Sequence, residues 1–335
     1  MRHVLTGLAG RLRRLAAAAA ITGLAALAGL AGAATTAPAA AYTVPNPYAT
    51  GPTPADVRIR KLVVFGDSFS KLNRKSFRNW AEQLRYDELN RTTGLPQVAT
   101  LVGRAVSGAT AGTYPGSTND FATQVASWLA SPRSFGGRDL TVVYFGHNDL
   151  EKSADPSGAD LSGAMADYRA ALQRVLAAGA AGGSRRVLLV MPHDWGRSPY
   201  YVANGGSAVL RQRTRAWNGL VAAEARRSSS ARLVAVDLFT AMECVFNQPA
   251  RFGLTNVTAP RPSGGDPRKY LYDYNDRFHF GPRGQALIRQ VVQYYLSRGW
   301  DWSNTYKDPA TARRRLTADL EAGRVFPGVP CSPAG

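Results

Sequence analysis

The sequence predicts a single doubly wound α/β domain, in which helices cover both faces of a mainly parallel five-stranded sheet. Short apolar runs rich in β-branched residues recur along the chain, and stretches with helical periodicity separate them. No internal repeat or low-complexity linker divides the 335 residues into two domains. Parallel strands need long crossover connections, which helices supply. The five predicted strands are 61–65, 101–106, 140–145, 187–191 and 233–236.

The first 41 residues have the pattern of an export signal. Four arginines precede an Ala/Leu/Gly-rich run over 15–30, and the favoured cleavage site follows Ala39-Ala40-Ala41. The run is too short and too diluted by Ala and Gly to favour a membrane anchor, and no second apolar stretch of about 18 residues occurs. We therefore expect a secreted, extracellular protein without a transmembrane anchor. Export by the Sec or the twin-arginine route stays open.

After the signal, residues 42–57 are rich in Pro, Thr and Ala and predict an extended lead-in. The folded domain is expected over 58–298. Within it, apolar residues recur at helical spacing over 121–129 and 161–176, so each segment predicts a helix with one apolar face. Residues 299–335 are expected to form a C-terminal appendage beyond the last helix.

The chain has two cysteines, Cys244 and Cys331. Export would place them in an oxidising compartment, so we expect one disulfide that tethers the C-terminal appendage to the domain. Two buried free thiols are the alternative. No Cys-x-x-Cys or His-x-x-x-His spacing occurs, so the sequence predicts no metal site. It also predicts no bound cofactor, because no glycine-rich phosphate-binding loop follows the first strand.

The chain is basic, with 41 Lys and Arg against 23 Asp and Glu and a formal charge of +18. Removal of the signal would leave a net charge of +14, which favours anionic partners such as a lipid surface or an acidic polysaccharide. The alternative is a solvated surface of scattered arginines, because no run of five or more like charges occurs. Nucleic acid is not expected as a partner, since neither a recognition-helix motif nor an aromatic RNA-binding signature is present.

Chemistry in such a fold is expected at the carboxyl ends of the strands. The first strand leads into Gly66-Asp67-Ser68-Phe69, where a helix is expected to begin at Ser68 and to offer N–H groups to an oxyanion. Ser68 is the candidate nucleophile, and a hydroxyl needs a general base. His279 is the best candidate, because Asp276 stands three residues earlier and can bind Nδ1 while Nε2 faces the serine.

Two further blocks follow the second and third strands, Val106-Ser107-Gly108-Ala109 and Gly146-His147-Asn148-Asp149. Together with the Ser68 and His279 blocks, in this order and spacing, they resemble the SGNH or GDSL hydrolases over about 62–296. The resemblance implies a flavodoxin-like fold and a catalytic triad of Ser68, Asp276 and His279. It also implies an oxyanion hole made of the backbone N–H groups of Ser68 and Gly108 and the side-chain amide of Asn148.

The chain departs from that family pattern at two positions. Phe69 stands where many members have Leu, and it keeps an apolar anchor. Gly103 stands where many have Asn, and this loss is expected to loosen the loop that carries Gly108.

These observations predict a secreted, cofactor-free, monomeric serine hydrolase of lipase or esterase type, which cleaves carboxylic esters through an acyl-enzyme on Ser68. The expected substrate is a small-molecule or lipid ester. One alternative is a carbohydrate acetylesterase acting on acetylated polysaccharide, and another, from a different class, is a non-catalytic secreted binding module with the same fold. Few residues are expected between Ser68 and the first helix, so the substrate site should be an open groove.

Overall fold

The computed structural model describes residues 61–73, 75–86, 100–131, 135–184, 186–227 and 232–300. All of them belong to one compact unit of the chain. The expected export signal, the lead-in, the C-terminal residues after Trp300 and Cys331 lie outside the described residues, so the signal and the disulfide stay predictions. Within the described ranges, no helix combines the length and hydropathy that a membrane span requires.

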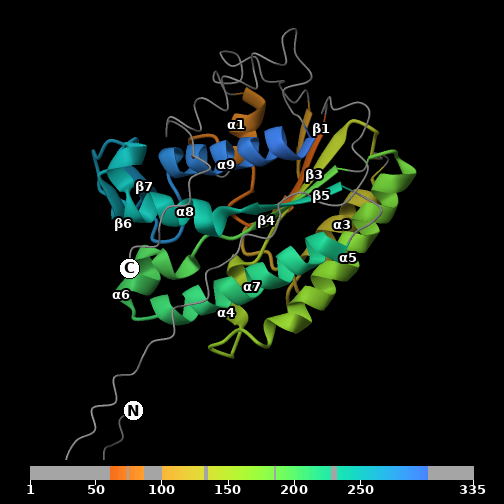
Figure 1. Ribbon diagram of the computed structural model, residues 1–335, viewed down its shortest axis with the longest axis horizontal. Coiled ribbons are helices and arrows are strands. Elements are labelled where there is room, and N and C mark those ends of the chain that lie inside the picture. The colour runs from red at the N-terminus through yellow and green to blue at the C-terminus, as the bar shows by residue number, and fades with distance from the viewer. Residues whose placement is uncertain are drawn as a thin grey trace, which may run out of the picture. The chain divides into compact units, whose positions relative to one another are not determined.

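A five-stranded parallel sheet forms the centre of the domain, in the order β2-β1-β3-β4-β5 (Figure 1). The predicted α/β fold class is confirmed. The chain winds outward from β1 in both directions, so the strand order reverses between β1 and β3, where a doubly wound sheet opens a crevice at its carboxyl edge. The strands are β1 (Lys61–Gly66), β2 (Thr100–Gly103), β3 (Asp139–Tyr144), β4 (Arg186–Met191) and β5 (Arg232–Asp237).

The inner strands are buried on both faces, which explains their continuous apolar sequences. In β1, the four residues from Leu62 to Phe65 have no exposed surface, and every residue of β3 and β4 is buried. The edge strand β2 is partly exposed and ends at Gly103, three residues before the predicted end. This sheet places the ends of β1 and β3 side by side at the switch point.

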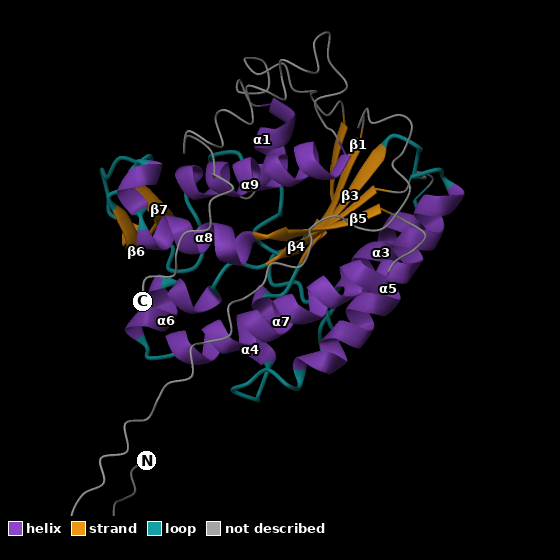
Figure 2. Ribbon diagram, viewed as in Figure 1, coloured by secondary structure: helices purple, strands orange, loops and turns teal. Residues whose placement is uncertain are grey.

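Helices form a layer on each face of the sheet (Figure 2). The layer of α3, α5 and α7 covers one face, and α1, α8 and α9 lie on the other. The helices are α1 (Trp80–Tyr86), α3 (Phe121–Leu129), α4 (His147–Lys152), α5 (Leu161–Ala181), α6 (Pro199–Ala203), α7 (Ser207–Arg227), α8 (Leu238–Asn247) and α9 (Pro282–Trp300). Two short 3-10 turns are η1 (Trp195–Arg197) and η2 (Pro249–Phe252).

A second, two-stranded parallel sheet, which the sequence did not predict, lies between α8 and α9 in the chain. It pairs β6 (Asn256–Arg261) with β7 (Tyr270–Tyr274) through an irregular register. The irregular pairing and Pro260 within β6 explain why the strand pattern was weak. The loop that carries Asp276 and His279 leaves from the end of β7.

The helix expected to begin at Ser68 is absent. Turns and bends occupy the described part of 67–79, and α1 begins only at Trp80. Asn79 caps that helix, because its Oδ1 accepts the N–H groups of Ala81 and Glu82, while Glu82 Oε2 accepts the N–H of Asn79. This is a reciprocal capping box. The loop after β1 is therefore long, contrary to the prediction of few residues between Ser68 and the first helix.

Gly103 is required by the path of this long loop. A Cβ at position 103 would lie 2.5 Å from Cγ of Leu72, so Leu72 packs directly over the glycine. The next residues also stay tied to β1: the Arg104 N–H donates to the Val64 carbonyl at 2.7 Å, and the Val106 N–H donates to the Gly66 carbonyl at 3.1 Å. The expected loosening of the loop before Gly108 is therefore not observed.

Candidate active site

Ser68, His279 and Asp276 lie in series at the carboxyl edge of the sheet. Ser68 follows β1, whereas the other two residues stand in the loop between β7 and α9. Oγ of Ser68 is 2.8 Å from Nε2 of His279, and Nδ1 of His279 is 3.0 Å from each carboxylate oxygen of Asp276. The fold thus brings a hydroxyl, an imidazole and a carboxylate together from segments 211 residues apart.

The turn that carries His279 is organised by Asp276 itself. Oδ1 of Asp276 accepts the backbone N–H groups of Phe278 at 3.0 Å and His279 at 2.8 Å. Asn275, just before it, adopts the left-handed conformation with φ of 52°, which asparagine tolerates better than most residues. The Asp-x-x-His spacing therefore works through an Asx turn, in which one carboxylate fixes both the backbone and the imidazole.

The electrostatics of Asp276 keep this carboxylate ionised. Burial raises its pKa, but the hydrogen bonds and the charge of His279 outweigh burial and hold the pKa well below its usual range. An ionised carboxylate can only accept hydrogen bonds, so Nδ1 of His279 must carry a proton. In the neutral imidazole, Nε2 is then an acceptor and can receive the hydroxyl proton of Ser68.

Gly108 lies in the loop after β2, and Asn148 lies in the first turn of α4, which follows β3; these are the two strands that flank β1. Gly108 has φ of +77°, a conformation that favours glycine, and the position of its absent Cβ has no atom within 4 Å. Asn148 Nδ2 donates one hydrogen bond to the Ala109 carbonyl at 2.7 Å. A side-chain amide carries two N–H groups, so this bond fixes the amide beside the Gly108 turn while the second N–H can serve a ligand.

Asp67 ties the loop of Ser68 to the start of α4. Its Oδ1 accepts the N–H of Phe69 at 2.9 Å, and its Oδ2 lies 3.0 Å from Nδ1 of His147. Both side chains are buried. Because His147 is directly followed by Asn148, this contact links the serine loop to the amide on the other side of the site.

His193, the other histidine of the described residues, is a packed core residue. It has no exposed surface, and its Nδ1 lies 3.4 Å from Nε2 of His147. Burial, followed by the charges of His147 and His279, lowers its pKa well below the usual value, so this imidazole stays neutral. The imidazole within hydrogen-bond distance of Ser68 Oγ is that of His279.

The ring of Phe69 contacts the imidazoles of both His147 and His279. The ring stacks on His147 with centroids 4.4 Å apart and lies 5.2 Å from the ring of His279. It also contacts the rings of Trp195 and Phe280 edge to face, at 5.8 and 5.7 Å. The aromatic residue thus shields one side of His279 from water, and at this position it does more than the apolar anchoring that the sequence predicted.

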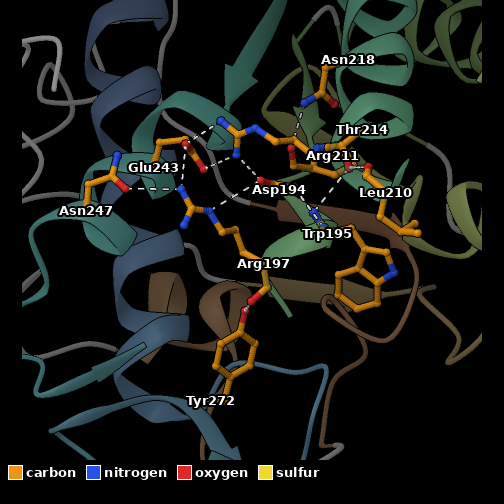
Figure 3. Close-up of polar contacts among 12 residues, drawn as sticks. Asp194, Trp195, Arg197, Leu210, Arg211, Thr214, Asn218, Glu243, Asn247 and Tyr272 are labelled. Atoms are coloured by element: carbon orange, nitrogen blue, oxygen red, sulfur yellow. Dashed lines mark hydrogen bonds and ion pairs between the residues drawn. The ribbon is translucent and has the colours of Figure 1, made fainter. Parts of the chain in front are cut away.

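The loop after β4, which carries Trp195, is held by a network of ion pairs (Figure 3). Asp194 forms an ion pair with Arg211 of α7 and accepts the N–H of Gly196. Arg211 also binds Glu243 of α8 at 2.8 Å, and Arg197 reaches the same carboxylate at 3.5 Å. These contacts attach the Trp195 loop to two helices, and no local sequence pattern indicates such a network.

Asp149 anchors the segment that follows Gly108. It is fully buried, and its carboxylate accepts the N–H groups of Ala111 at 2.8 Å and Gly112 at 3.0 Å. Burial raises the pKa of Asp149 to about 7, although these N–H groups act in the opposite direction. Asp149, in the first turn of α4, therefore anchors the segment after Gly108.

This raised pKa predicts a pH dependence of stability. In the unfolded chain an aspartate titrates near 3.9, so between about pH 4 and pH 7 the folded state binds the extra proton. The stabilisation is fully present below pH 4 and is lost as the pH rises through 7. We expect the free energy of unfolding of the parent, relative to Asp149→Asn, to fall by about 1.4 kcal/mol for each pH unit crossed within this window. Urea unfolding at pH 4.5 and 7.5 measures it, and parallel pH dependences in the two proteins would contradict it.

Comparison with known proteins identifies the family. A family model described as GDSL-like lipase/acylhydrolase matches residues 62–292. No curated protein sequence matches the chain. Similar solved structures include a catalytic mutant of Axe2, an acetylxylan esterase from Geobacillus stearothermophilus, with 15% identity, a TM-score of 0.45 and coverage of 74% of this chain and 97% of that one. Another is the lipase/acylhydrolase from Enterococcus faecalis, with 18% identity, a TM-score of 0.39 and coverage of 72% and 97%.

The solved structures are distant in sequence, whereas the family match spans more than half of the chain and includes the segments that carry Ser68, Gly108, Asn148, Asp276 and His279. The protein is therefore an ester-cleaving hydrolase that belongs to the GDSL-like lipase/acylhydrolase family.

Proposed function

We propose that this chain is a secreted serine hydrolase that cleaves carboxylic esters of small-molecule or lipid type through an acyl-enzyme on Ser68. One observation carries the proposal: Ser68 Oγ lies 2.8 Å from His279 Nε2, while His279 Nδ1 lies 3.0 Å from both oxygens of an ionised Asp276. This geometry supports a nucleophile, a general base and an orienting carboxylate in the order that acyl transfer requires.

In the first half-reaction, Ser68 Oγ bonds to the carbonyl carbon of the ester and its proton moves to Nε2 of His279. The carbonyl oxygen becomes an oxyanion, which the N–H groups of Ser68 and Gly108 and the amide of Asn148 are proposed to bind. The bond from carbon to the alkoxy oxygen then breaks, and His279 gives its proton to the leaving alcohol. The acyl group remains on Ser68.

In the second half-reaction, a water molecule takes the place of the alcohol. His279 accepts one proton of the water as its oxygen bonds to the acyl carbon, and the same proton returns to Ser68 Oγ when the acyl bond breaks. The sum is one ester and one water converted to one acid and one alcohol. Asp276 stays ionised throughout and stabilises the imidazolium that forms in each half.

The surroundings of the triad support an ester with a short or medium acyl chain. The pocket at Ser68 is shallow and is lined by residues that include Phe77 and Gln285. Next to His279, the ring of Phe278 stacks on Trp195 with centroids 5.7 Å apart and makes a tilted contact with Tyr200 at 4.8 Å, and Tyr200 is 39% exposed. An apolar ester can gain contact on this surface, but carbons beyond the groove stay wet and gain little of the ~0.8 kcal/mol that each buried methylene contributes.

A carbohydrate acetylesterase is the second candidate, and one observation favours it. A polar cavity of about 400 Å³ lies along the segment that follows Gly108, lined among others by Tyr114, Lys152, Asp160 and Asp167. Hydroxyl-rich sugar residues would suit such a lining. For this substrate class, the acetyl group would sit at Ser68.

A panel of substrates tests both candidates. We expect a fluorophosphonate probe to label Ser68, and p-nitrophenyl ester hydrolysis to peak at short to medium acyl chains and to fall at palmitate. Preference for acetylated xylan over every acyl ester would select the acetylesterase. A chain that neither reacts with the probe nor hydrolyses any ester would be a binding module with the same fold.

If the basic charge serves a lipid role, salt should weaken hydrolysis of anionic vesicles much more than that of a neutral soluble ester.

A further inference from the structure

The ammonium group of Lys75 lies between two carboxylates beside the proposed triad. Its Nζ is 3.1 Å from Oδ2 of Asp276 and 3.0 Å from Oδ2 of Asp273, at the end of β7. The three side chains are largely buried, with exposed fractions of 29% for Lys75, 13% for Asp276 and 9% for Asp273. Lys75 stands in the same long loop as Ser68, so this contact joins the serine loop to the loop of Asp276 and His279.

Several elements of the fold bring charged groups close to His279. Its own loop contributes Asp276, and β7 contributes Asp273. From β6, the guanidinium of Arg261 faces Asp273, with 3.6 Å between Nη2 and Oδ1. From the loop after β4 come the neutral imidazole of His193 and the charges of Asp194 and Arg197, which form ion pairs with Arg211 and Glu243.

A further pair, Asp67 with His147, lies behind the ring of Phe69. That ring also contacts the imidazole of His279. Lys75 is therefore a cation in direct contact with the carboxylate that binds His279.

This arrangement has a consequence for the basicity of His279. A carboxylate in contact with an imidazole favours the charged imidazolium, and two carboxylates near each other favour it more strongly. An ammonium bound to both carboxylates cancels part of that attraction, because its charge repels the imidazolium through a poorly solvated region. With Lys75 in place, His279 should lose its proton at a lower pH and be available as a base over a wider range.

We propose that Lys75 is a positioning residue that holds the Asp276 carboxylate and sets the pH at which His279 becomes an effective base. The inference rests on the proposed function, in which His279 takes the proton of Ser68. It also explains the long loop after β1, which carries the ammonium across to the loop of Asp276. Lys75 itself does not touch the reacting atoms.

The first test is the pH profile of kcat/KM for a neutral soluble ester. Lys75→Met is expected to move the acid limb upward by about half to one pH unit, because the carboxylate pair is no longer neutralised. Lys75→Arg keeps the charge and should restore most of the parent profile. Lys71→Met is the matched control: it removes one positive charge from the same loop, at an exposed side chain, and should leave the limb in place.

A second variant predicts the opposite sign. Asp273→Asn removes one carboxylate and leaves Lys75 bound to Asp276, so the ammonium is less neutralised and the acid limb should move to lower pH. This variant keeps the lysine, so the test survives if Lys75→Met fails to fold. Melting temperatures of all variants identify any that are unfolded at the assay temperature.

An NMR titration of the His279 ring protons in a Ser68→Ala background measures the same shift without catalysis. The proposed function and the role of Lys75 therefore fail in different ways. If the parent protein is inactive and Ser68→Ala does not lower its activity further, only the proposed function is refuted. Unchanged His279 titration in both Lys75→Met and Asp273→Asn would overturn the role of Lys75. So would shifts of the same sign in these two variants, or an equal shift in Lys71→Met.

Discussion

Replacement of Ser68 with alanine is expected to lower kcat/KM more than about a thousandfold while the fold stays intact. The change removes a single oxygen, Oγ, which lies within hydrogen-bond distance of Nε2 of His279. No acyl-enzyme can form without that oxygen, whereas the half-buried β-carbon keeps its packing. Steady-state kinetics and the melting temperature of the purified variant measure the two halves of the prediction.

Ser70→Ala is the matched control for this experiment. Ser70 stands two residues later and is fully buried, and its Oγ accepts the indole N–H of Trp80 at 3.3 Å. Loss of that hydrogen bond should cost about 1 kcal/mol of unfolding free energy and leave the hydrolysis rate within a small factor. A Ser68→Ala variant that retained more than a thousandth of the parent rate would show that another group is the nucleophile.

The second large effect is expected for Asp276→Asn, which should lower kcat by about 10² to 10⁴. The amide oxygen can still accept the N–H groups of Phe278 and His279, so the turn should survive. An amide N–H directed at Nδ1, however, favours the tautomer in which Nε2 carries the proton. That imidazole cannot accept the hydroxyl proton of Ser68, so the defect should appear in kcat rather than in substrate binding.

The same variant should change acid stability in a defined direction. The lowered pKa of Asp276 means that its stabilising effect is present above the unfolded pKa near 3.9 and is lost as the pH falls through the folded value. Asp276→Asn should therefore flatten the acid limb of the unfolding curve. Asp266→Asn, at an exposed ion pair with Arg268, serves as the control and should alter neither kinetics nor acid stability by much. A parent-like kcat in Asp276→Asn would separate Asp276 from the chemistry.

The fold was predictable from sequence because its central strands carry a strong signal. Buried parallel strands such as β1, β3 and β4 are continuous apolar runs, and helices with one apolar face separate them, so the hydrophobic pattern along the chain predicts the order of elements. The small sheet of β6 and β7 was missed because its register is irregular and Pro260 interrupts β6. The helix expected at Ser68 was wrong, although the sequence Asn79-Trp80-Ala81-Glu82 contains the capping pattern that marks the true start of α1.

Part of the candidate site was also predictable, because its residues follow strand ends at fixed spacings. Ser68, Gly108, Asn148, Asp276 and His279 stand in short blocks that can be recognised without a structure. Lys75 could not be recognised in this way, since its contact with Asp276 depends on the path of a 13-residue loop. The rings of Phe278 and Tyr200 meet for a similar reason: the loop after β4 and the loop after β7 pack together only in the folded chain.

The distance in sequence between Ser68 and His279 bears on when activity can first appear. During synthesis, a nascent chain that has emerged as far as α8 contains Ser68, Gly108 and Asn148 but neither Asp276 nor His279. Such a chain lacks the general base His279, and Lys75 has neither Asp273 nor Asp276 to bind. Hydrolysis would thus begin only after the last quarter of the domain has packed onto the sheet.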